Sequence, residues 1–93
     1  MDEFFKLDFG KSIRNKLSRT KIRYNGQLIY KVTNKTGNKY LKKGYGLYLD
    51  SLHYDHLEVI DRQGVVRCVL NLDGSLNVDK TLKAEGRTIK GWK

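Results

Sequence analysis

The 93-residue chain is predicted to be an α+β domain, mainly β, with a short N-terminal helix packed on a highly twisted antiparallel sheet of about five or six strands. Two observations carry this prediction. Apolar residues recur at every fourth position from Phe5 to Leu17, the spacing of one helix face. After Lys21, short β-rich segments alternate with Asn-Gly and Asp-Gly pairs, which are strong hairpin signals. This length suits one domain, with a helical segment at 1–20 and the sheet at 21–93.

The helix is expected within residues 2–19. Phe5, Phe9, Ile13 and Leu17 would form its apolar stripe. Gly10 falls inside the pattern and weakens a helix by about 1 kcal/mol relative to alanine. The helix is therefore expected either as two pieces or with a start near Lys11.

The β-rich part begins with a hairpin, in which residues 21–24 and 27–33 flank Asn25-Gly26, a pair suited to a type I′ turn. The next strand is expected at 47–49, after a bend at Gly44 and Gly46. The remaining expectations are a turn at 36–38, a cationic strand or loop at 39–43, a strand at 56–60, a turn at 61–64, a strand at 65–72, a turn at 73–74, a short return strand at 75–78 and a tail at 80–93 with little periodicity and Trp92 as its anchor.

Composition excludes several classes of protein. The single cysteine, Cys68, excludes an internal disulfide and a structural zinc site built from thiolates. Its neighbours are valines and a leucine, so we expect a small buried hydrophobe in a strand rather than a nucleophile. No apolar run reaches the roughly 18–20 residues of a membrane span. The N-terminus is acidic where an export signal is basic, and we expect Met1 to be a boundary inside a longer chain.

Charge divides the chain into three parts. Residues 1–47 carry 12 Lys/Arg and 3 Asp/Glu, residues 48–79 carry 2 and 6, and residues 80–93 carry 5 and 1. The net charge of +9 favours polyanionic partners, with nucleic acid first, an anionic membrane second and an acidic covering protein third. Lys42, Lys43, Lys83 and Lys90 are candidates to hold RNA phosphates, although such lysines can also form a solvated face.

Six tyrosines are interleaved with these cations. Tyrosine rings stack on unpaired bases, and they are also ordinary strand residues. We expect two or three of the six in the core, and we assign Tyr48 and Tyr54 to RNA.

The acidic middle part contains both histidines of the chain, within residues 50–58. RNA cleavage by its own 2′-hydroxyl needs a base, an acid and a cation that stabilises charge on the phosphoryl oxygens. His56 and Glu58 share one face of the predicted strand, and Asp50 and His53 lie just before it. A zinc site formed by Asp50, His53, Asp55 and His56 stays open as an alternative, as does a solvated surface.

The same stretch carries a family resemblance. Tyr48-Leu-Asp50-Ser-Leu-His53, Leu57-Glu58, Asp61-Arg-Gln-Gly64, Leu72-Asp73-Gly74 and the tail Arg87-Thr-Ile89-Lys90-Gly-Trp92 resemble the cytotoxic ribonuclease domain of certain colicins and S-type pyocins, also found at the C-termini of contact-dependent and polymorphic bacterial toxins. The resemblance covers residues 45–93. It departs from the colicin pattern at one point, with four residues instead of three between His53 and Glu58.

The resemblance implies a metal-independent endoribonuclease, without a cofactor, that cuts small-subunit ribosomal RNA at the decoding site. It places Asp50, His53, Glu58 and Arg87 in the active site, with Glu58 as general base, His53 as general acid, Asp50 orienting the histidine and Arg87 stabilising the phosphorane. The extra residue makes His56 a rival acid.

Delivery and partners also follow from the resemblance. Such a domain is secreted or delivered within a larger toxin, acts in the cytoplasm of the target bacterium and is neutralised by an acidic immunity protein. The alternatives are a transfer-RNA-cleaving toxin, a non-catalytic RNA- or ribosome-binding module and a metal-dependent nuclease.

Overall fold

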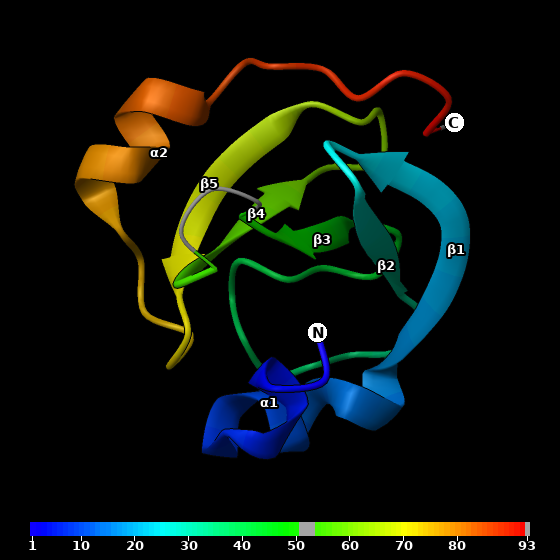
Figure 1. The fold of residues 1–93 in the computed structure, drawn as a ribbon, viewed down its shortest axis with the longest axis vertical. Coiled ribbons are helices and arrows are strands. Elements are labelled where there is room, and N and C mark those ends of the chain that lie inside the picture. The colour runs from blue at the N-terminus through cyan, green and yellow to red at the C-terminus, as the bar shows by residue number, and fades with distance from the viewer. Residues whose placement is uncertain (51–53, 93) are drawn as a thin grey trace.

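The computed structural model describes residues 1–50 and 54–92 and has one antiparallel sheet of five strands in the order β1-β2-β3-β4-β5 (Figure 1). The elements are η1 (Phe4–Lys6), α1 (Asp8–Ile13), η2 (Arg14–Lys16), β1 (Leu17–Tyr24), β2 (Gln27–Val32), β3 (Gly46–Leu49), β4 (His56–Ile60), β5 (Val66–Asn71) and α2 (Val78–Ala84). The predicted α+β class is confirmed, with five strands and a helical segment at the N-terminus.

The predicted first hairpin is confirmed. Tyr24 pairs with Gln27, and the two residues between them have positive φ angles, 47° at Asn25 and 81° at Gly26. A type I′ turn requires a positive φ at both central residues, and its twist matches that of the two strands. Strand β1 nevertheless starts at Leu17, earlier than predicted, and its pairing with β2 is irregular between Arg19 and Arg23.

The helical segment expected within residues 2–19 forms in short pieces, η1, α1 and η2, in line with one of the two predicted alternatives, but its first break lies at Leu7 and not at Gly10. Leu7 is extended, with φ −81° and ψ 156°, and separates η1 from α1. Gly10 lies inside α1, where an added Cβ would overlap the carbonyl oxygen of Phe4. The chain therefore folds back tightly on itself before the sheet, which a four-residue apolar repeat does not reveal.

Buried side chains form two clusters, because successive strand residues point to opposite faces of the sheet. The N-terminal core lies against the helical segment and consists of Phe4, Ile13, Tyr30, Val32, Leu41, Leu47, Leu49, Leu57, Val59, Cys68 and Leu70. The C-terminal core lies on the other face and consists of Ile29, Tyr48, Ile60, Val66, Val69, Ala84, Ile89 and Trp92. Cys68 is a buried hydrophobe, as predicted.

The chain after β5 differs from the prediction. The return strand at 75–78 is reduced to one bridge between Leu76 and Leu70. Helix α2 begins at Val78, where the side chain of Asn77 caps it by accepting a hydrogen bond from the backbone N–H of Lys80 at 3.0 Å. The last segment then crosses the molecule toward the end of β1, and Trp92 is buried as the predicted anchor (Figure 1).

No helix formed by residues 1–50 and 54–92 has the length and apolar character needed to cross a membrane.

Candidate active site

Glu58 lies in the middle of β4, on the face of the C-terminal core. Its Cα is paired with Tyr48 of β3 and with Val69 of β5. Only 6% of the residue is exposed. One carboxylate oxygen, Oε1, accepts a hydrogen bond from the hydroxyl of Tyr48 at 2.8 Å and another from Nη1 of Arg87 at 2.9 Å. A buried carboxylate is thus held by two charge-assisted hydrogen bonds, which are stronger than neutral ones.

Arg87 reaches Glu58 because the segment after α2 is tied to the start of β5. The backbone N–H of Val66 donates to the carbonyl of Arg87 at 2.7 Å, and the N–H of Gly86 donates to the carbonyl of Val66 at 2.9 Å. A further bridge joins Val65 and Thr88. These bonds place a residue 29 positions away along the chain directly beside Glu58.

Two tyrosine rings complete this arrangement, which we call the Glu58 network (Tyr24, Tyr48, Glu58, Arg87). The guanidinium of Arg87 lies 5.7 Å from the ring centroid of Tyr24, and the ring centroids of Tyr24 and Tyr48 are 5.4 Å apart. A guanidinium that stacks on an aromatic ring still presents its N–H donors in its own plane, where they can bind an anion. Of the Arg87 side chain, 39% is exposed, so part of the cation faces solvent.

The electrostatics keep the network in one charge state. Burial raises the pKa of Tyr48, and the hydrogen bond and negative charge of Glu58 raise it further, so the phenol stays protonated as a donor. Partial burial acts to lower the pKa of Arg87, but the negative charge of Glu58, followed by Tyr24 and Tyr48, outweighs it and raises the pKa. The network therefore consists of an ionised guanidinium and a neutral phenol around one carboxylate.

His56 lies two residues before Glu58 on the same strand face and is 5% exposed. Its Nδ1 lies 2.7 Å from Oδ1 of Asp55, and its Nε2 lies 3.7 Å from Oδ1 of Asp50. The backbone N–H of Asp50 donates to the carbonyl of His56 at 3.0 Å, which closes the end of the β3–β4 hairpin. Carboxylates thus lie on both sides of the imidazole.

Three side chains here could also hold a metal ion. Ligand atoms of Asp50, Asp55 and His56 all lie within 4.8 Å of one another. Oxygen and imidazole donors suit zinc and other first-row transition metals. The alternative metal reading of this stretch thus keeps three of its four residues, and the fourth, His53, lies outside the described residues.

The catalytic residues predicted from sequence come together in part. Asp50 lies beside His56, and Arg87 lies beside Glu58. Tyr48 contacts Glu58 instead of facing solvent. Because only 2% of the residue is exposed, its ring has no surface on which RNA could stack, and the predicted role of Tyr48 in RNA binding is wrong. The hydroxyl of Tyr48 donates its hydrogen bond to Glu58 inside the protein.

The predicted RNA-binding residues are dispersed. Tyr54 is exposed, lies two residues before His56 and has a positive φ of 58°. Lys42 and Lys43 lie in the connection from β2 to β3, which joins the opposite ends of these strands from Asp50 and His56. Lys83 lies on α2 and Lys90 in the last segment, and both are exposed.

Two residues that make contacts in the candidate active site were not predicted to do so from the sequence. Tyr24 was read only as one of six interleaved aromatics, although its place directly before the Asn25-Gly26 turn puts it at the tip of a hairpin. Asp55 was considered only as a metal ligand, whereas its carboxylate contacts His56. Adjacent residues of a strand normally point apart, so the bend at Tyr54 and Asp55, before β4 begins, is what permits this contact.

No protein-family model, curated protein or solved structure matches this chain.

Proposed function

We propose that the protein is a metal-independent endoribonuclease that cleaves RNA through attack of the 2′-hydroxyl on the neighbouring phosphate. The observation that carries the proposal is the Glu58 network, with a histidine flanked by carboxylates two residues away on the same strand face. This part of the fold brings together a carboxylate, an imidazole and a guanidinium. Those are the three groups that this reaction uses.

The reaction balances with these groups alone. Glu58 takes the proton of the 2′-hydroxyl, and the 2′-oxygen bonds to phosphorus. Arg87 stabilises the negative charge on the phosphoryl oxygens through donors that Glu58 does not use. The bond from phosphorus to the 5′-oxygen breaks, and an imidazolium from the segment 53–56 protonates the leaving oxygen. The products are a 2′,3′-cyclic phosphate and a 5′-hydroxyl.

The tyrosine hydroxyl has a separate task. Tyr48 donates to Glu58 from a buried position and holds the carboxylate in one orientation. The neutral state of Tyr48, favoured by burial, makes it a donor through the ordinary pH range.

The substrate that we propose is ribosomal RNA at the decoding site of the small subunit, with transfer RNA as the alternative within the same chemistry. The net charge of +9 supports a polyanionic substrate. We further propose that the domain is a toxin of the colicin and contact-dependent kind, delivered to a competing bacterium as part of a larger chain and neutralised by an acidic immunity protein. The motifs at 48–64 and 87–92 support this part.

The decisive experiment is cleavage in a translation extract containing EDTA, followed by primer extension on ribosomal and transfer RNAs. We expect one dominant cut and fragments that end in 2′,3′-cyclic phosphate. Glu58→Gln should abolish the cut. Glu85→Gln removes an equally charged but exposed carboxylate after α2 and should leave it intact. Intact RNA at protein concentrations near that of the ribosomes would refute the proposal.

The general acid is identified by a second pair of variants. His53→Ala and His56→Ala are compared for single-turnover cleavage across pH 5–8. The acid is the histidine whose removal abolishes the alkaline limb of the rate profile, because that limb reports loss of the proton from an imidazolium. If neither variant changes the profile, neither imidazole donates the proton.

A metal-dependent nuclease is the second candidate, and the proximity of Asp50, Asp55 and His56 supports it. Cleavage that disappears in EDTA and returns with Zn²⁺ or Mn²⁺ would favour it over the first. Asp55→Asn then becomes the informative variant, since it removes a ligand without altering the Glu58 network.

A further inference from the structure

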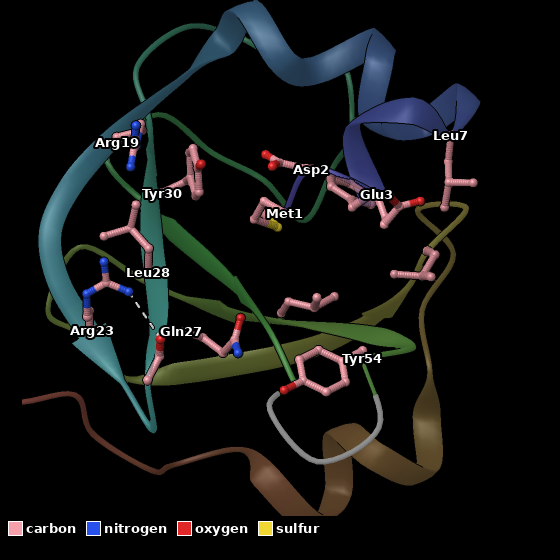
Figure 2. A pocket seen from close by; sticks show the side chains of 14 residues that line it. Met1, Asp2, Glu3, Leu7, Arg19, Arg23, Gln27, Leu28, Tyr30 and Tyr54 are labelled. Atoms are coloured by element: carbon pink, nitrogen blue, oxygen red, sulfur yellow. Dashed lines mark hydrogen bonds between the residues drawn. The ribbon is translucent and has the colours of Figure 1, made fainter.

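A concave site lies on the opposite face of the sheet from the Glu58 network. This cavity has a volume of about 710 Å³. Figure 2 shows its lining side chains, which come from the N-terminal segment, from the hairpin of β1 and β2 and from neighbouring loops. We call it the arginine pocket, lined by Met1, Asp2, Glu3, Phe4, Leu7, Arg19, Arg23, Gly26, Gln27, Leu28, Tyr30, Leu49, Tyr54 and Leu72. Its volume falls in the range of sites for small organic molecules, roughly 300–1,000 Å³.

Two arginines line one side of the arginine pocket. Arg19 and Arg23 belong to β1 and lie on either side of its irregular pairing with β2. No carboxylate of the described residues lies within ion-pairing distance of either guanidinium. Arg23 uses one nitrogen to donate to the carbonyl of Gly26 at 3.2 Å, and its other donors stay available (Figure 2). Planar guanidiniums without a carboxylate partner suit phosphate oxygens.

The floor of the pocket is apolar and partly aromatic. Leu28, Tyr30 and Leu49 come from β2 and β3, and they are continuous with the N-terminal core. Tyr54 stands at the rim near Gln27, with 57% of its surface exposed (Figure 2). An exposed ring above an apolar floor accommodates a planar base, since base–aromatic stacking contributes about 1–3 kcal/mol per base.

Hydrogen-bond acceptors complete the lining. Glu3 is paired with Lys6 at 3.3 Å, whereas Asp2 has no cation within ion-pairing distance among the described residues. Asp2 and Gln27 can accept hydrogen bonds from an exocyclic amino group of a base. The carboxylate repels phosphate, so a nucleotide would place its phosphate toward Arg19 and Arg23.

The arginine pocket and the candidate active site border the same end of the sheet. Arg23 lines the pocket, while the next residue, Tyr24, stacks on Arg87. Tyr54 lines the pocket, while the next residue, Asp55, contacts His56. In an antiparallel meander the β1–β2 and β3–β4 turns lie at one end, so both pairs sit at that edge. A single RNA strand crossing this edge would touch both faces.

We propose that the arginine pocket binds one unpaired nucleotide of an RNA strand, next to the nucleotides at the Glu58 network. The base stacks on Tyr54 above the apolar floor, the phosphate contacts Arg19 and Arg23, and Asp2 and Gln27 favour bases with an amino group over uracil. This assignment rests on the proposed function for its RNA substrate, but the pocket's affinity for a nucleotide is measurable without cleavage.

The first test is an NMR titration of the 93-residue chain with 5′-AMP, 5′-CMP, 5′-UMP, adenosine and inorganic phosphate. We expect AMP and CMP to shift the backbone amides of Gln27, Leu28 and Leu49, with UMP weaker. Arg19→Gln/Arg23→Gln should weaken AMP binding at least about tenfold, as expected for losing two charge-assisted contacts. Lys11→Gln/Lys21→Gln removes the same charge from exposed positions outside the pocket and should change affinity by less than about threefold.

Two results of this titration would overturn the proposal. Shifts by inorganic phosphate as large as those by AMP would mean an anion site with no base recognition. Equal loss in the two double variants would mean general electrostatic attraction. Tyr54→Ala supplies a further variant that leaves all charges in place, and it should weaken AMP binding while phosphate binding is unchanged. If Tyr54→Ala leaves AMP affinity unchanged, base stacking in the pocket is refuted.

The second test uses a 2′-O-methylated RNA 12-mer, which cannot undergo 2′-hydroxyl attack, in fluorescence anisotropy. We expect the arginine double variant to lose affinity for this RNA and to show a raised KM with little change in kcat on cleavable RNA. Cleavage by the arginine double variant with an unchanged KM would refute the pocket assignment and leave the ribonuclease proposal standing.

Nucleotide binding to the pocket without any RNA cleavage by the protein would refute the ribonuclease proposal and leave the pocket assignment standing. Tighter binding of an acidic peptide than of the RNA would assign the pocket to a protein partner.

Discussion

The two faces of the sheet are filled by different chemistry. The N-terminal core consists only of apolar residues and two residues with a weakly polar group, Tyr30 and Cys68. The C-terminal core surrounds a buried carboxylate, Glu58, and a buried imidazole, His56, with Arg87 at its edge. Burying a charge costs free energy even when it is paired, and an apolar pair of similar volume is often as stable. The composition of the N-terminal core is therefore what a stable fold requires. The C-terminal core contains ionisable groups that stability alone does not require.

The same contrast appears in how each face is covered. The N-terminal core is closed by residues that follow one another in η1, α1 and η2, next to β1 along the chain. The C-terminal core is closed by α2 and the last segment, which are tied to β5 by hydrogen bonds such as that from the N–H of Val69 to Oγ1 of Thr81 at 2.8 Å. Function is expected to depend on the second covering layer, because it supplies Arg87.

The largest expected effect separates activity from stability on the C-terminal face. Arg87→Met should lower RNA cleavage by about a thousandfold, as losses of groups that stabilise transition-state charge typically do. It should also destabilise the fold by about 1–3 kcal/mol, because the buried carboxyl group of Glu58 loses its hydrogen bond from the guanidinium, a cost reduced here by the partial exposure of Arg87. Single-turnover kinetics and urea unfolding measure the two effects.

A double variant sharpens this prediction. Glu58→Gln/Arg87→Met removes both charges and should be more stable than Arg87→Met alone, while it stays inactive. If the double variant is less stable than the single one, Arg87 contributes mainly through packing on Tyr24 and not through Glu58.

The next effect belongs to the N-terminal face and should be confined to stability. Leu47 is fully buried in that core, and Leu47→Ala should lower the free energy of unfolding by about 2–5 kcal/mol, through lost burial and the cavity left behind. Cleavage by the folded fraction should be unchanged. A large loss of kcat in folded protein would show that the two faces are coupled.

A smaller effect is expected at the tyrosine that holds Glu58. Tyr48→Phe removes one hydrogen bond to a buried carboxylate and should cost about 1–3 kcal/mol of stability. Because Arg87 remains, cleavage should fall less than in Arg87→Met. Equal losses of activity in the two variants would show that Tyr48 acts on the reaction as strongly as the guanidinium does.

The smallest effect concerns pH and involves both faces. Burial raises the pKa of Cys68 from its ordinary value near 9.0 to about 11, and it also raises the pKa of Tyr48. The folded state holds both groups protonated, so the contribution of Cys68 is fully present below about pH 9 and is lost as the pH rises through about 11, whereas that of Tyr48 is lost only above its ordinary pKa of 10.0. Cys68→Ala should flatten the part of this loss that begins near pH 9. Thermal unfolding at pH 8, 9, 10 and 11 checks it, and an unchanged slope in the variant would contradict the assignment to Cys68.

Much of the sheet was predictable because its signals are local. The Asn25-Gly26 turn was identified from the two residues that tolerate positive φ. The strand at 56–60 has the predicted bounds, since alternation over five residues with a turn after it has few other readings. Helix α2 was missed although Asn77 is a good cap and Gly86 follows the helix, because the cationic tail around them has no apolar stripe.

The candidate site was predictable only in its residue types. A cluster of acids and histidines within nine residues of a cationic chain is visible in the sequence, and so is the arginine near the end. The resemblance to toxin ribonucleases named Glu58 and Arg87 together, but neither spacing nor composition shows that one accepts a hydrogen bond from the other. The burial of Tyr48 was equally invisible, because a strand tyrosine suits the surface and the core alike.

The sequence by itself determined the α+β class, turns such as Asn25-Gly26 that join neighbouring strands, the net charge and the set of groups available for chemistry. Those properties depend on residues close together along the chain. The tertiary structure decided which groups meet. Arg87 reaches Glu58 through the backbone bonds of residues 64–66 with 86–89. The neighbouring pairs Arg23–Tyr24 and Tyr54–Asp55 each border both faces, because the meander brings two turns to one edge. Contacts between residues 29 positions apart depend on how the covering layer packs, which no local pattern specifies.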